Sequence, residues 1–383
     1  MSAPDLVVIG AGALGAATAY YAARAGLAVE VVERGAIVSG TTSAGEGNLL
    51  VSDKVAGPEL DLALLSYRLW RGELAEHAGL WEFEAKGGLV VTTDDAGATA
   101  LGELAGRQRD AGVEVDVLTA DRAHELEPHL TRDLTGAALY PQDSQVQPML
   151  MAAHLLRLAR GLGARVRTGT TVTGFLRDGD RVVGVRTDRG DVAAGHVVNA
   201  AGTWAGEVAT LAGVEVPVLP RRGFILVTEP LPPTVHHKVY AGEYVASTQS
   251  AGEGLQVSTV VEGTASGTVL VGSSRERVGF DRTVSLPVLR ELARQALRLY
   301  PTLAPVALMR TYLGFRPYCP DHLPVIGLDP RAPGLAHVAG HEGAGIGLSV
   351  GSAHVLVQAL TGRRPDLDLA PFAPERFSLQ GVA

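Results

Sequence analysis

The chain has 383 residues, of which 46% are hydrophobic and 19% are charged, and it contains 47 glycines. This composition excludes a disordered chain, collagen, a coiled coil and a disulfide-stabilised mini-protein, and the length predicts two domains or one large α/β domain with an insertion. The formal net charge is -8, which argues against nucleic acid or an anionic membrane as the main partner and makes small molecules the expected ligands.

The number of cysteines and the apolar segments predict where in the cell the protein is found. Cys319 is the only cysteine, so no intramolecular disulfide is possible, and we predict a cytoplasmic protein. The N-terminus has no basic segment before its first apolar run, which is typical of a core strand rather than a signal peptide. The apolar stretch from Gly343 to Leu360 contains polar and small residues, so no membrane span is expected.

The first 80 residues begin with the pattern of a βαβ unit. We predict a strand from Leu6 to Ile9, a helix from Ala13 to Ala25 and a strand from Ala28 to Val32, because short apolar runs flank an alanine-rich helical period. A connection rich in Gly, Ser and Thr follows from Gly35 to Gly47. Leucines at helical spacing then predict one long helix from Pro58 to His77.

The remaining elements mix helices with strands separated by turn residues. In chain order we expect a strand from Gly87 to Thr93, a helix from Ala96 to Ala111, strands from Val113 to Leu118 and Ala137 to Pro141, a helix from Met149 to Leu162, a β-meander from Thr170 to Ala200, mostly strands from Val216 to Val271, a helix from Pro287 to Tyr300, a return segment from Thr311 to Pro317, a strand from Leu335 to Ala339 and a closing helix from Gly347 to Leu360.

A glycine motif sits between the first predicted strand and helix, and it reads Gly10-Ala11-Gly12-Ala13-Leu14-Gly15. Gly10 permits a tight turn, Gly12 lets the backbone approach a pyrophosphate and Gly15 allows close packing of helix on strand, while the helix N-terminus faces the phosphate charge. Glu33 ends the second strand 23 residues after Gly10, where a carboxylate accepts hydrogen bonds from an adenosine ribose. The motif therefore predicts a dinucleotide cofactor, without distinguishing FAD from NAD.

Further motifs in the same order resemble the glycine and D-amino acid oxidase (DAO) family of flavoproteins over nearly the whole chain. They are the βαβ start through Glu33 and Arg34, Gly40-Thr41-Thr42-Ser43-Ala44-Gly45, Asn199-Ala200-Ala201-Gly202-Thr203-Trp204, Gly314-Phe315-Arg316-Pro317, and the run from Gly340 to Leu348. Within the family, Ala44 to Leu49, Gly223-Phe224 and Arg316 to Pro324 are most similar to the D-hydroxyproline dehydrogenase and hydrogen cyanide synthase catalytic subunits.

The resemblance implies an FAD site and names its contacts. Thr41 to Gly45 lacks bulky side chains where a connection must pass close to a flat ring, and the glycines before the last helix place a second N-terminus near the flavin. The implied cofactor-binding residues are Gly10, Ala11, Gly12, Ala13, Leu14, Gly15, Glu33, Arg34, Thr41, Thr42, Ser43, Ala44, Gly45, Asn48, Leu49, Val172, Ala200, Ala201, Gly202, Trp204, Gly340, Gly343, Gly345, Ile346, Gly347 and Leu348.

Arg316 is the expected substrate ligand. It occupies the position at which amine oxidases of this family hold the substrate carboxylate in two parallel hydrogen bonds, although a structural ion pair is the alternative. The implied reaction is hydride transfer from Cα to flavin N5, a step that needs a neutral amine and close approach more than a strong general base.

Other candidates for the active site are His341, Tyr244 and Tyr318. His341 and Glu342 are expected beside the flavin, with a structural role equally plausible for each. Tyr240, Tyr244 and Tyr318 are candidates to line the substrate pocket, because a phenol offers an apolar face and a hydrogen bond, and core packing is the alternative for each. The pair His236-His237 lacks a third ligand at suitable spacing, so no metal is predicted.

Two departures from the family pattern affect the cofactor. Some members hold FAD through a cysteine at the position that is Gly314 here, while Cys319 lies elsewhere, so we predict non-covalent FAD. Sarcosine oxidases carry a lysine that assists reaction with dioxygen, and the matching position here is Leu270. Dioxygen and other electron acceptors, including partner subunits, therefore both stay open.

These observations predict an α/β protein. It would combine a Rossmann-like FAD-binding domain of the glutathione reductase type with an inserted α+β substrate domain on a mixed, mostly antiparallel sheet. We assign residues 1-84, 142-214 and 310-383 to the FAD-binding domain and 85-141 and 215-309 to the substrate domain. The expected function is oxidation of the Cα–N bond of a small amino or imino acid, such as D-proline, D-hydroxyproline, glycine or sarcosine, to the imine. The alternatives are a tailoring flavoprotein for a larger amine and a flavin-bearing subunit that is inactive without partners.

Overall fold

One half of the molecule is built on a six-stranded sheet. The computed structural model describes residues 3–244 and 252–377. The strand order is β18-β19-β12-β1-β2-β8, and neighbours are parallel except β18, which is antiparallel to β19. The strands are β1 (Leu6–Ile9), β2 (Val29–Val32), β8 (Arg165–Arg167), β12 (His196–Asn199), β18 (Val325–Leu328) and β19 (Leu335–Ala339). The central strand β1 is buried along its whole length, as expected for a parallel sheet covered on both faces.

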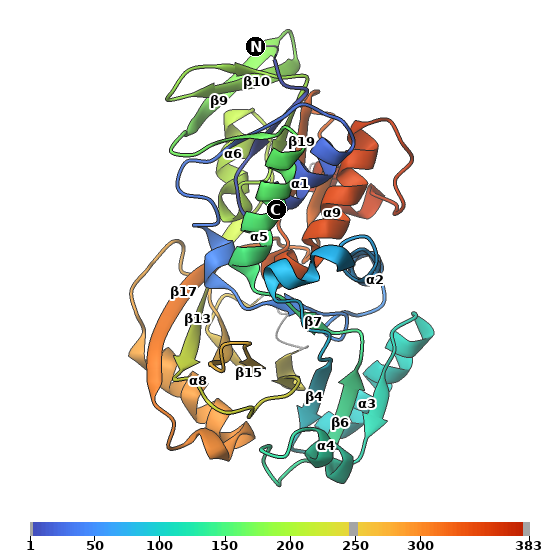
Figure 1. The fold of residues 1–383 in the computed structure, drawn as a ribbon, viewed down its shortest axis with the longest axis vertical. Helices are drawn as coiled ribbons and strands as arrows, with labels where there is room; N and C mark the ends of the chain where they lie inside the picture. Colours follow the sequence, from blue (N-terminus) through green and yellow to red (C-terminus); the bar gives the residue numbers. More distant parts are fainter. Residues whose placement is uncertain (1–2, 245–251, 378–383) are drawn as a thin grey trace.

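Helices cover one face of this sheet, and a small meander lies on the other (Figure 1). Helix α1 packs between α5 and α9, and α2 packs on α9. The elements on the helical face are α1 (Ala13–Arg24), α2 (Pro58–Arg71), α5 (Pro148–Gly161) and α9 (Gly345–Leu360). Those on the opposite face are β9 (Val172–Asp178), β10 (Arg181–Thr187), β11 (Val192–Ala193) and α6 (Ala205–Leu211).

Helix α9 and the turn before it, Glu342–Leu360, form the one described helical segment whose length and hydropathy match a membrane span. Its residues from Gly347 to Gln358 are nearly all buried. The helix contacts α1, α2 and β18, so its apolar surface is used in packing inside the protein. This is the behaviour of a core helix hydrophobic on most sides.

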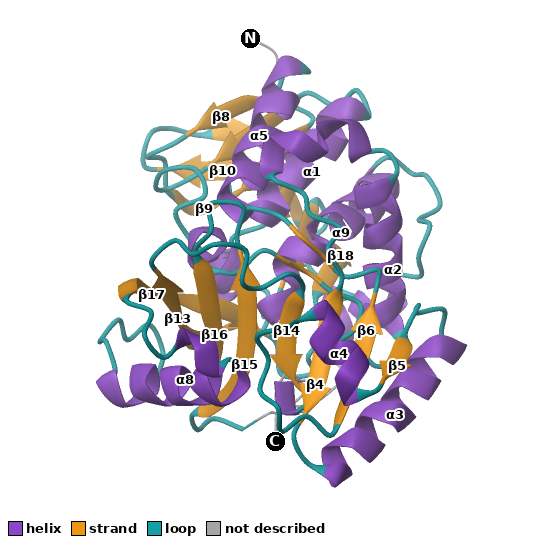
Figure 2. Ribbon diagram, turned by 60° about the horizontal axis from the view of Figure 1, so that its bottom comes forward, coloured by secondary structure: helices purple, strands orange, loops and turns teal. Residues whose placement is uncertain are grey.

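The other half is an eight-stranded sheet with the order β17-β13-β16-β15-β14-β4-β6-β5 (Figure 2). Only β14 and β4 pair in parallel. The strands are β4 (Gly88–Thr92), β5 (Asp116–Leu118), β6 (Gly136–Tyr140), β13 (Leu219–Thr228), β14 (Lys238–Ala241), β15 (Gln256–Gly263), β16 (Val269–Arg275) and β17 (Leu308–Tyr318). The helices packed on it are α3 (Asp95–Asp110), α4 (Ala120–Leu126) and α8 (Leu286–Leu299). A short pair, β3 (Asn48–Leu49) with β7 (Ser144–Gln145), forms a separate ribbon.

The predicted fold class is confirmed, but the predicted meander ends at β11, because β12 belongs to the six-stranded sheet, and one helix differs clearly in length. The helix expected to continue to His77 ends at Arg71, and a separate 3-10 helix follows from Ala75 to Trp81. Gly72 causes the break, because its backbone turns so closely that a Cβ there would lie 2.8 Å from the carbonyl oxygen of Arg68. The domain boundaries stay a prediction. Strand β17 runs across the boundary proposed at residue 310 and shares one sheet with strands of both inserted segments.

Candidate functional site

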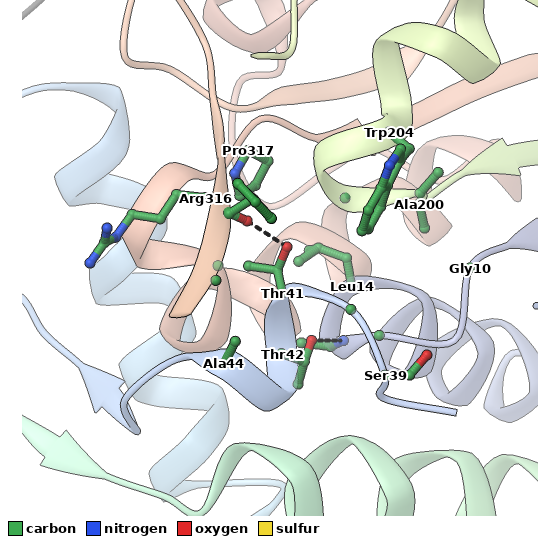
Figure 3. A pocket seen from close by; sticks show the side chains of 18 of the residues that line it. Gly10, Leu14, Ser39, Thr41, Thr42, Ala44, Ala200, Trp204, Arg316 and Pro317 are labelled. Atoms are coloured by element: carbon green, nitrogen blue, oxygen red, sulfur yellow. Dashed lines mark hydrogen bonds between the residues drawn. The ribbon is translucent and has the colours of Figure 1, made fainter. Parts of the chain in front are cut away.

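A cavity of about 440 Å³ lies between the six-stranded sheet and the eight-stranded sheet. Its size is within the range of small-molecule and cofactor sites. Of the residues predicted from the sequence, the cavity wall contains Gly10, Gly12, Ala13, Leu14, Glu33, Arg34, Thr41, Thr42, Ala44, Gly45, Asn48, Val172, Ala200, Ala201, Gly202, Trp204, Tyr244, Arg316, Gly343, Gly345 and Ile346. Figure 3 shows Trp204, Ala200 and Gly10 on one side of Thr41 and Leu14, with Arg316 on the other.

The glycine motif forms the tight crossing that a dinucleotide requires. Gly10 has a φ of +106°, and a Cβ there would lie 2.6 Å from the carbonyl oxygen of Ala200. A Cβ on Gly15 would lie 1.9 Å from the carbonyl oxygen of Gly10, so helix α1 starts in direct contact with the turn. A Cβ on Gly12 would meet only the Thr42 hydroxyl, at 3.1 Å, and Gly12 lines the cavity. The backbone at Gly12 is therefore accessible from the cavity, and the start of α1 provides a positive dipole end for a phosphate.

Glu33 is held rigidly at the end of β2. Its Oε2 accepts a hydrogen bond from the backbone N–H of Ala11 at 2.9 Å, and its Oε1 accepts one from Gly35 at 2.7 Å. A carboxylate has about four acceptor positions, so capacity is left for two ribose hydroxyls. Arg34 stacks over the indole ring of Trp204 at 4.0 Å, which closes the same end of the cavity.

Threonines join three segments of the wall. Thr41 and Thr203 both donate to the carbonyl oxygen of Phe315 on β17, at 2.7 and 2.8 Å. The Thr42 hydroxyl accepts from the N–H of Ala13 at 3.0 Å, which ties the segment Thr41–Ala44 to the start of α1 (Figure 3). These bonds fix the small-residue connection against both halves of the protein, as a site for a flat, elongated cofactor requires.

Nine predicted site residues do not line the cavity: Ala11, Gly15, Ser43, Leu49, Tyr318, Gly340, His341, Gly347 and Leu348. Gly347 packs α9 on β3, since a Cβ there would lie 3.2 Å from the carbonyl oxygen of Asn48. Gly340, with a φ of +77°, packs on Cys319, and Ser43 bonds back to Gly40. These positions support the shape of the wall and make no direct contact with the cavity.

The tyrosines and His341 occupy different environments. Tyr244 lines the cavity, whereas Tyr240 is fully buried and donates a hydrogen bond to Asp143 outside it. Tyr318 is buried beneath Arg221 and Arg277. His341 bonds through Nε2 to the Ser352 hydroxyl at 2.8 Å inside α9. Of these candidates, only Tyr244 is therefore placed to touch a ligand.

Burial of His341 predicts a pH dependence of stability. Desolvation lowers the pKa of this imidazole from 6.5 to about 3, so the folded protein keeps it neutral while the unfolded chain protonates it. Its contribution to stability is therefore present above pH 6.5 and is lost as the pH falls toward 3. We expect His341→Gln to reduce the loss of unfolding free energy between pH 7 and 4.5 by about 2 kcal/mol. Urea unfolding at both pH values measures this, and equal losses in variant and wild type would contradict it.

The end of the cavity opposite Glu33 carries the predicted substrate ligand. Arg316 lies flat across β13 at Gly223 and donates to the carbonyl oxygen of Ser274 on β16 at 2.8 Å. Burial, followed by repulsion from Arg275, lowers the pKa of Arg316 to about 10, so the guanidinium stays charged at neutral pH. Tyr244 lies close by, with the guanidinium of Arg275 4.8 Å above its ring. This end can bind an anionic group.

Gly223 is what allows Arg316 to adopt this position. A Cβ on Gly223 would lie 2.2 Å from Nη1 of Arg316 and 2.5 Å from the Ser274 oxygen. We expect Gly223→Ala to displace the guanidinium and to raise the KM of a carboxylate substrate by roughly tenfold or more, because small displacements of binding groups are costly. Steady-state kinetics measure it, with Gly102→Ala on the open face of α3 as the control. An unchanged KM would contradict this role.

Several wall residues were missed from the sequence. Gly223 and Ile225 on β13, Glu46 after the segment Thr41–Ala44, and Gly314 on β17 all line the cavity. Glu46, Gly223 and Gly314 are part of the sequence motifs described above. No short-range pattern in the sequence, however, indicated that β13, β17 and residue 46 lie together in the fold. Glu342, considered only as a neighbour of the flavin, also lines the cavity and accepts hydrogen bonds from Arg221 and His322.

Several known proteins are similar to this chain in sequence and in fold. The family model described as DAO, FAD dependent oxidoreductase, matches residues 5–359. The hydrogen cyanide synthase subunit HcnC of Pseudomonas aeruginosa is 32% identical over 84% of this chain and 75% of its own length. The glycine oxidase of the same species is 31% identical over 96% of this chain and 98% of its own. The crystal structure of glycine oxidase from Geobacillus kaustophilus has a TM-score of 0.88 at 28% identity and covers 97% of this chain and 98% of that one.

The residues matched by the family model, 5–359, include the strands of both sheets. The glycine cradle at Gly10 and Gly12, Glu33 at the end of β2 and the small residues from Thr41 fit an FAD molecule. The chain therefore belongs to the DAO family of FAD-dependent oxidoreductases.

Proposed function

We propose that this FAD-dependent oxidoreductase oxidises the Cα–N bond of a small amino or imino acid to the imine. The observation that carries the proposal is Arg316, a charged guanidinium in the cavity wall at the end opposite the ribose-binding Glu33. A guanidinium in this setting selects a carboxylate next to the reacting centre. Relatives named glycine oxidase support an amino acid as the substrate class.

The chain's own residues bind and orient the reactants. When bound, FAD supplies a two-electron acceptor for the hydrogen on Cα. The N–H groups of Ala11 and Ala13 are taken by Glu33 and Thr42, which leaves those of Gly12 and Leu14, two residues of the wall, for the pyrophosphate. Arg316 orients the substrate through its carboxylate, and Tyr244 adds an apolar ring beside it.

An anaerobic titration tests this function. The FAD-loaded protein is mixed in turn with D-proline, D-hydroxyproline, sarcosine and glycine while the absorbance of oxidised flavin is recorded. We expect one of them to bleach the band, and admission of air then distinguishes an oxidase from a dehydrogenase. If none of them reduces the flavin, the proposal for a small amino acid fails, and a larger amine or a missing partner becomes the better explanation.

A partner subunit remains part of the proposal. HcnC is named as a subunit of a synthase, and no lysine lies in the described cavity wall to assist reaction with dioxygen. Electron transfer to a partner protein would then replace reaction with air. Reoxidation that is slow in air and fast with an artificial acceptor supports this version. We also propose a cytoplasmic location, on the basis of the single cysteine.

We further propose that FAD is held without a covalent bond. Cys319 is fully buried, lies outside the cavity wall and packs beside Gly340. Burial raises the pKa of this thiol well above its ordinary value, so it has little thiolate character. We expect acid or heat denaturation to release all flavin into the supernatant. Flavin absorbance that stays with the precipitated protein would contradict this.

A further inference from the structure

Glu46 is a buried carboxylate in the cavity wall that the reaction described above does not use. Its side chain is 9% exposed, and Oε1 has no hydrogen-bond partner among the described residues. The carboxylate lies against β16, because a Cβ on Gly272 would be 2.9 Å from Oε1 and 3.1 Å from Oε2. Burying a carboxylate oxygen without a hydrogen-bond partner is costly, and Glu46 also lines the cavity, so its carboxylate is available to pair with a ligand there.

Charged and polar groups surround Glu46 from four strands. Lys238 on β14 is in a buried ion pair with Glu262 on β15, and among the described residues it forms no ion pair with Glu46. The remaining neighbours are Arg275 on β16, and Arg316 and Tyr312 on β17. Burial raises the pKa of the Glu46 carboxyl more than Lys238 lowers it. The group is therefore a better proton acceptor than an exposed glutamate.

Glu46 and Arg316 belong to one chamber. Both line the cavity, and both act electrostatically on the phenol of Tyr244 from the same wall. An amino acid at neutral pH carries a carboxylate and an ammonium group, and the chamber provides one group of the opposite charge for each. The ammonium must lose a proton before Cα can be oxidised, because only a neutral nitrogen has the lone pair that an imine needs.

We propose that Glu46 binds the amino group of the substrate and takes a proton from its ammonium form. The N–H bond breaks, an O–H bond forms at Glu46, and the electron pair stays on nitrogen. This inference rests on the proposed function, since it assumes that the substrate is an amine held through its carboxylate by Arg316. It adds a second specificity contact, which selects amino acids against carboxylates that lack nitrogen.

Two ligands that cannot be oxidised separate these contacts. 2-Aminoisobutyrate has both charged groups but no hydrogen on Cα, and isobutyrate has the same carbon skeleton without nitrogen. Calorimetric titration of the FAD-loaded protein measures both affinities without turnover. We expect Glu46→Gln to lower the affinity for 2-aminoisobutyrate by roughly 10- to 100-fold, the range for loss of a hydrogen bond to a charged group. Isobutyrate should bind equally well or more tightly, because a negative charge near its carboxylate is removed.

The pH dependence gives a second signature. In the wild type, 2-aminoisobutyrate should bind more weakly as the pH falls and Glu46 becomes protonated, whereas Glu46→Gln should lack this fall. Glu46→Asp keeps the charge and should recover part of the affinity. Glu84→Gln is the matched control. Glu84 is a partly exposed carboxylate that pairs with Lys86 outside the cavity wall, so this variant should leave the affinity for both ligands unchanged.

The outcomes distinguish this inference from the proposed function. If Glu46→Gln lowers the affinity for both ligands equally, or leaves the affinity for 2-aminoisobutyrate unchanged, the role of Glu46 is overturned while the proposed function stands. Failure of both ligands to bind the wild type overturns the proposed function and this inference with it. Flavin content and thermal unfolding of each variant show whether the variant is folded.

Discussion

Replacing Arg316 by alanine should reduce kcat/KM for the carboxylate substrate by roughly 100- to 1,000-fold, mainly through KM, because truncating one partner of a desolvated ion pair costs about 3 to 4 kcal/mol. The guanidinium lies in the cavity wall on β17, and no other arginine of the described wall except Arg34, near Trp204, faces this cavity. FAD binding should be retained, since Gly10 and Arg316 lie on opposite sides of Thr41 and Leu14 (Figure 3). Kinetics and the flavin spectrum measure the two effects separately.

Two further variants make the Arg316 result specific. Arg316→Lys keeps a positive charge but loses the planar fork, so its loss should be intermediate. Arg310→Ala removes an exposed arginine from the same strand and should leave kcat/KM unchanged. The amine without the carboxylate is the substrate control. If Arg316→Ala lowers kcat/KM for this amine as much as for the amino acid, Arg316 acts on something other than the carboxylate.

Gly15→Ala should have the second large effect, on both stability and cofactor content. The added methyl group would lie 1.9 Å from the carbonyl oxygen of Gly10, a backbone atom, so the helix or the turn must shift to admit it. Forcing apart a packed helix and turn costs about 3 kcal/mol, and it would displace the start of α1, which would hold the pyrophosphate of FAD. We expect a lower Tm and a purified protein that has lost most of its FAD.

Gly12→Ala provides the contrast. Its φ of -86° suits any residue, and the new Cβ would meet only the Thr42 hydroxyl at 3.1 Å, so the fold should be kept. The methyl group would still obstruct the approach of a pyrophosphate, so FAD affinity should fall while the unfolding of the apoprotein stays close to wild type. Gly102→Ala on α3 meets no atom within 4 Å and should change neither quantity. Equal stability losses at Gly12 and Gly15 would contradict this division of roles.

Much of the cofactor end could be predicted because its information is local. Strand β1, the glycine motif, helix α1 and Glu33 follow one another within 33 residues, and the spacing of apolar residues and glycines identifies each of them. The helix that ends at Gly72 instead of His77 shows the limit of this approach. Its apolar period continues past the glycine, and only the backbone geometry at Gly72 decides where the helix stops.

The substrate end depended on contacts between residues far apart in the chain. Glu46, Gly272 and Arg316 meet because β13 pairs with both β16 and β17 and the connection from Thr41 is tied to Phe315. The spacing of apolar residues along the chain does not predict such long-range contacts. The same holds for His341, which the sequence places in a glycine-rich turn beside the expected flavin and whose ring the structure places against Ser352, outside the cavity wall.

The sequence by itself thus determined the βαβ start and a dinucleotide cofactor, because both depend on residue types at short, fixed spacings, while the choice of FAD and of Arg316 for the substrate carboxylate came from the resemblance to the DAO family. Only the tertiary structure decided which side chains share the chamber with that arginine. Strand pairing over more than 200 residues brings Glu46 beside Gly272 of β16 and leaves its Oε1 without a hydrogen-bond partner among the described residues. Burial then raises the free-energy cost of that unpaired oxygen, since this cost depends on the surroundings of the group in the folded protein and not on its neighbours in the chain.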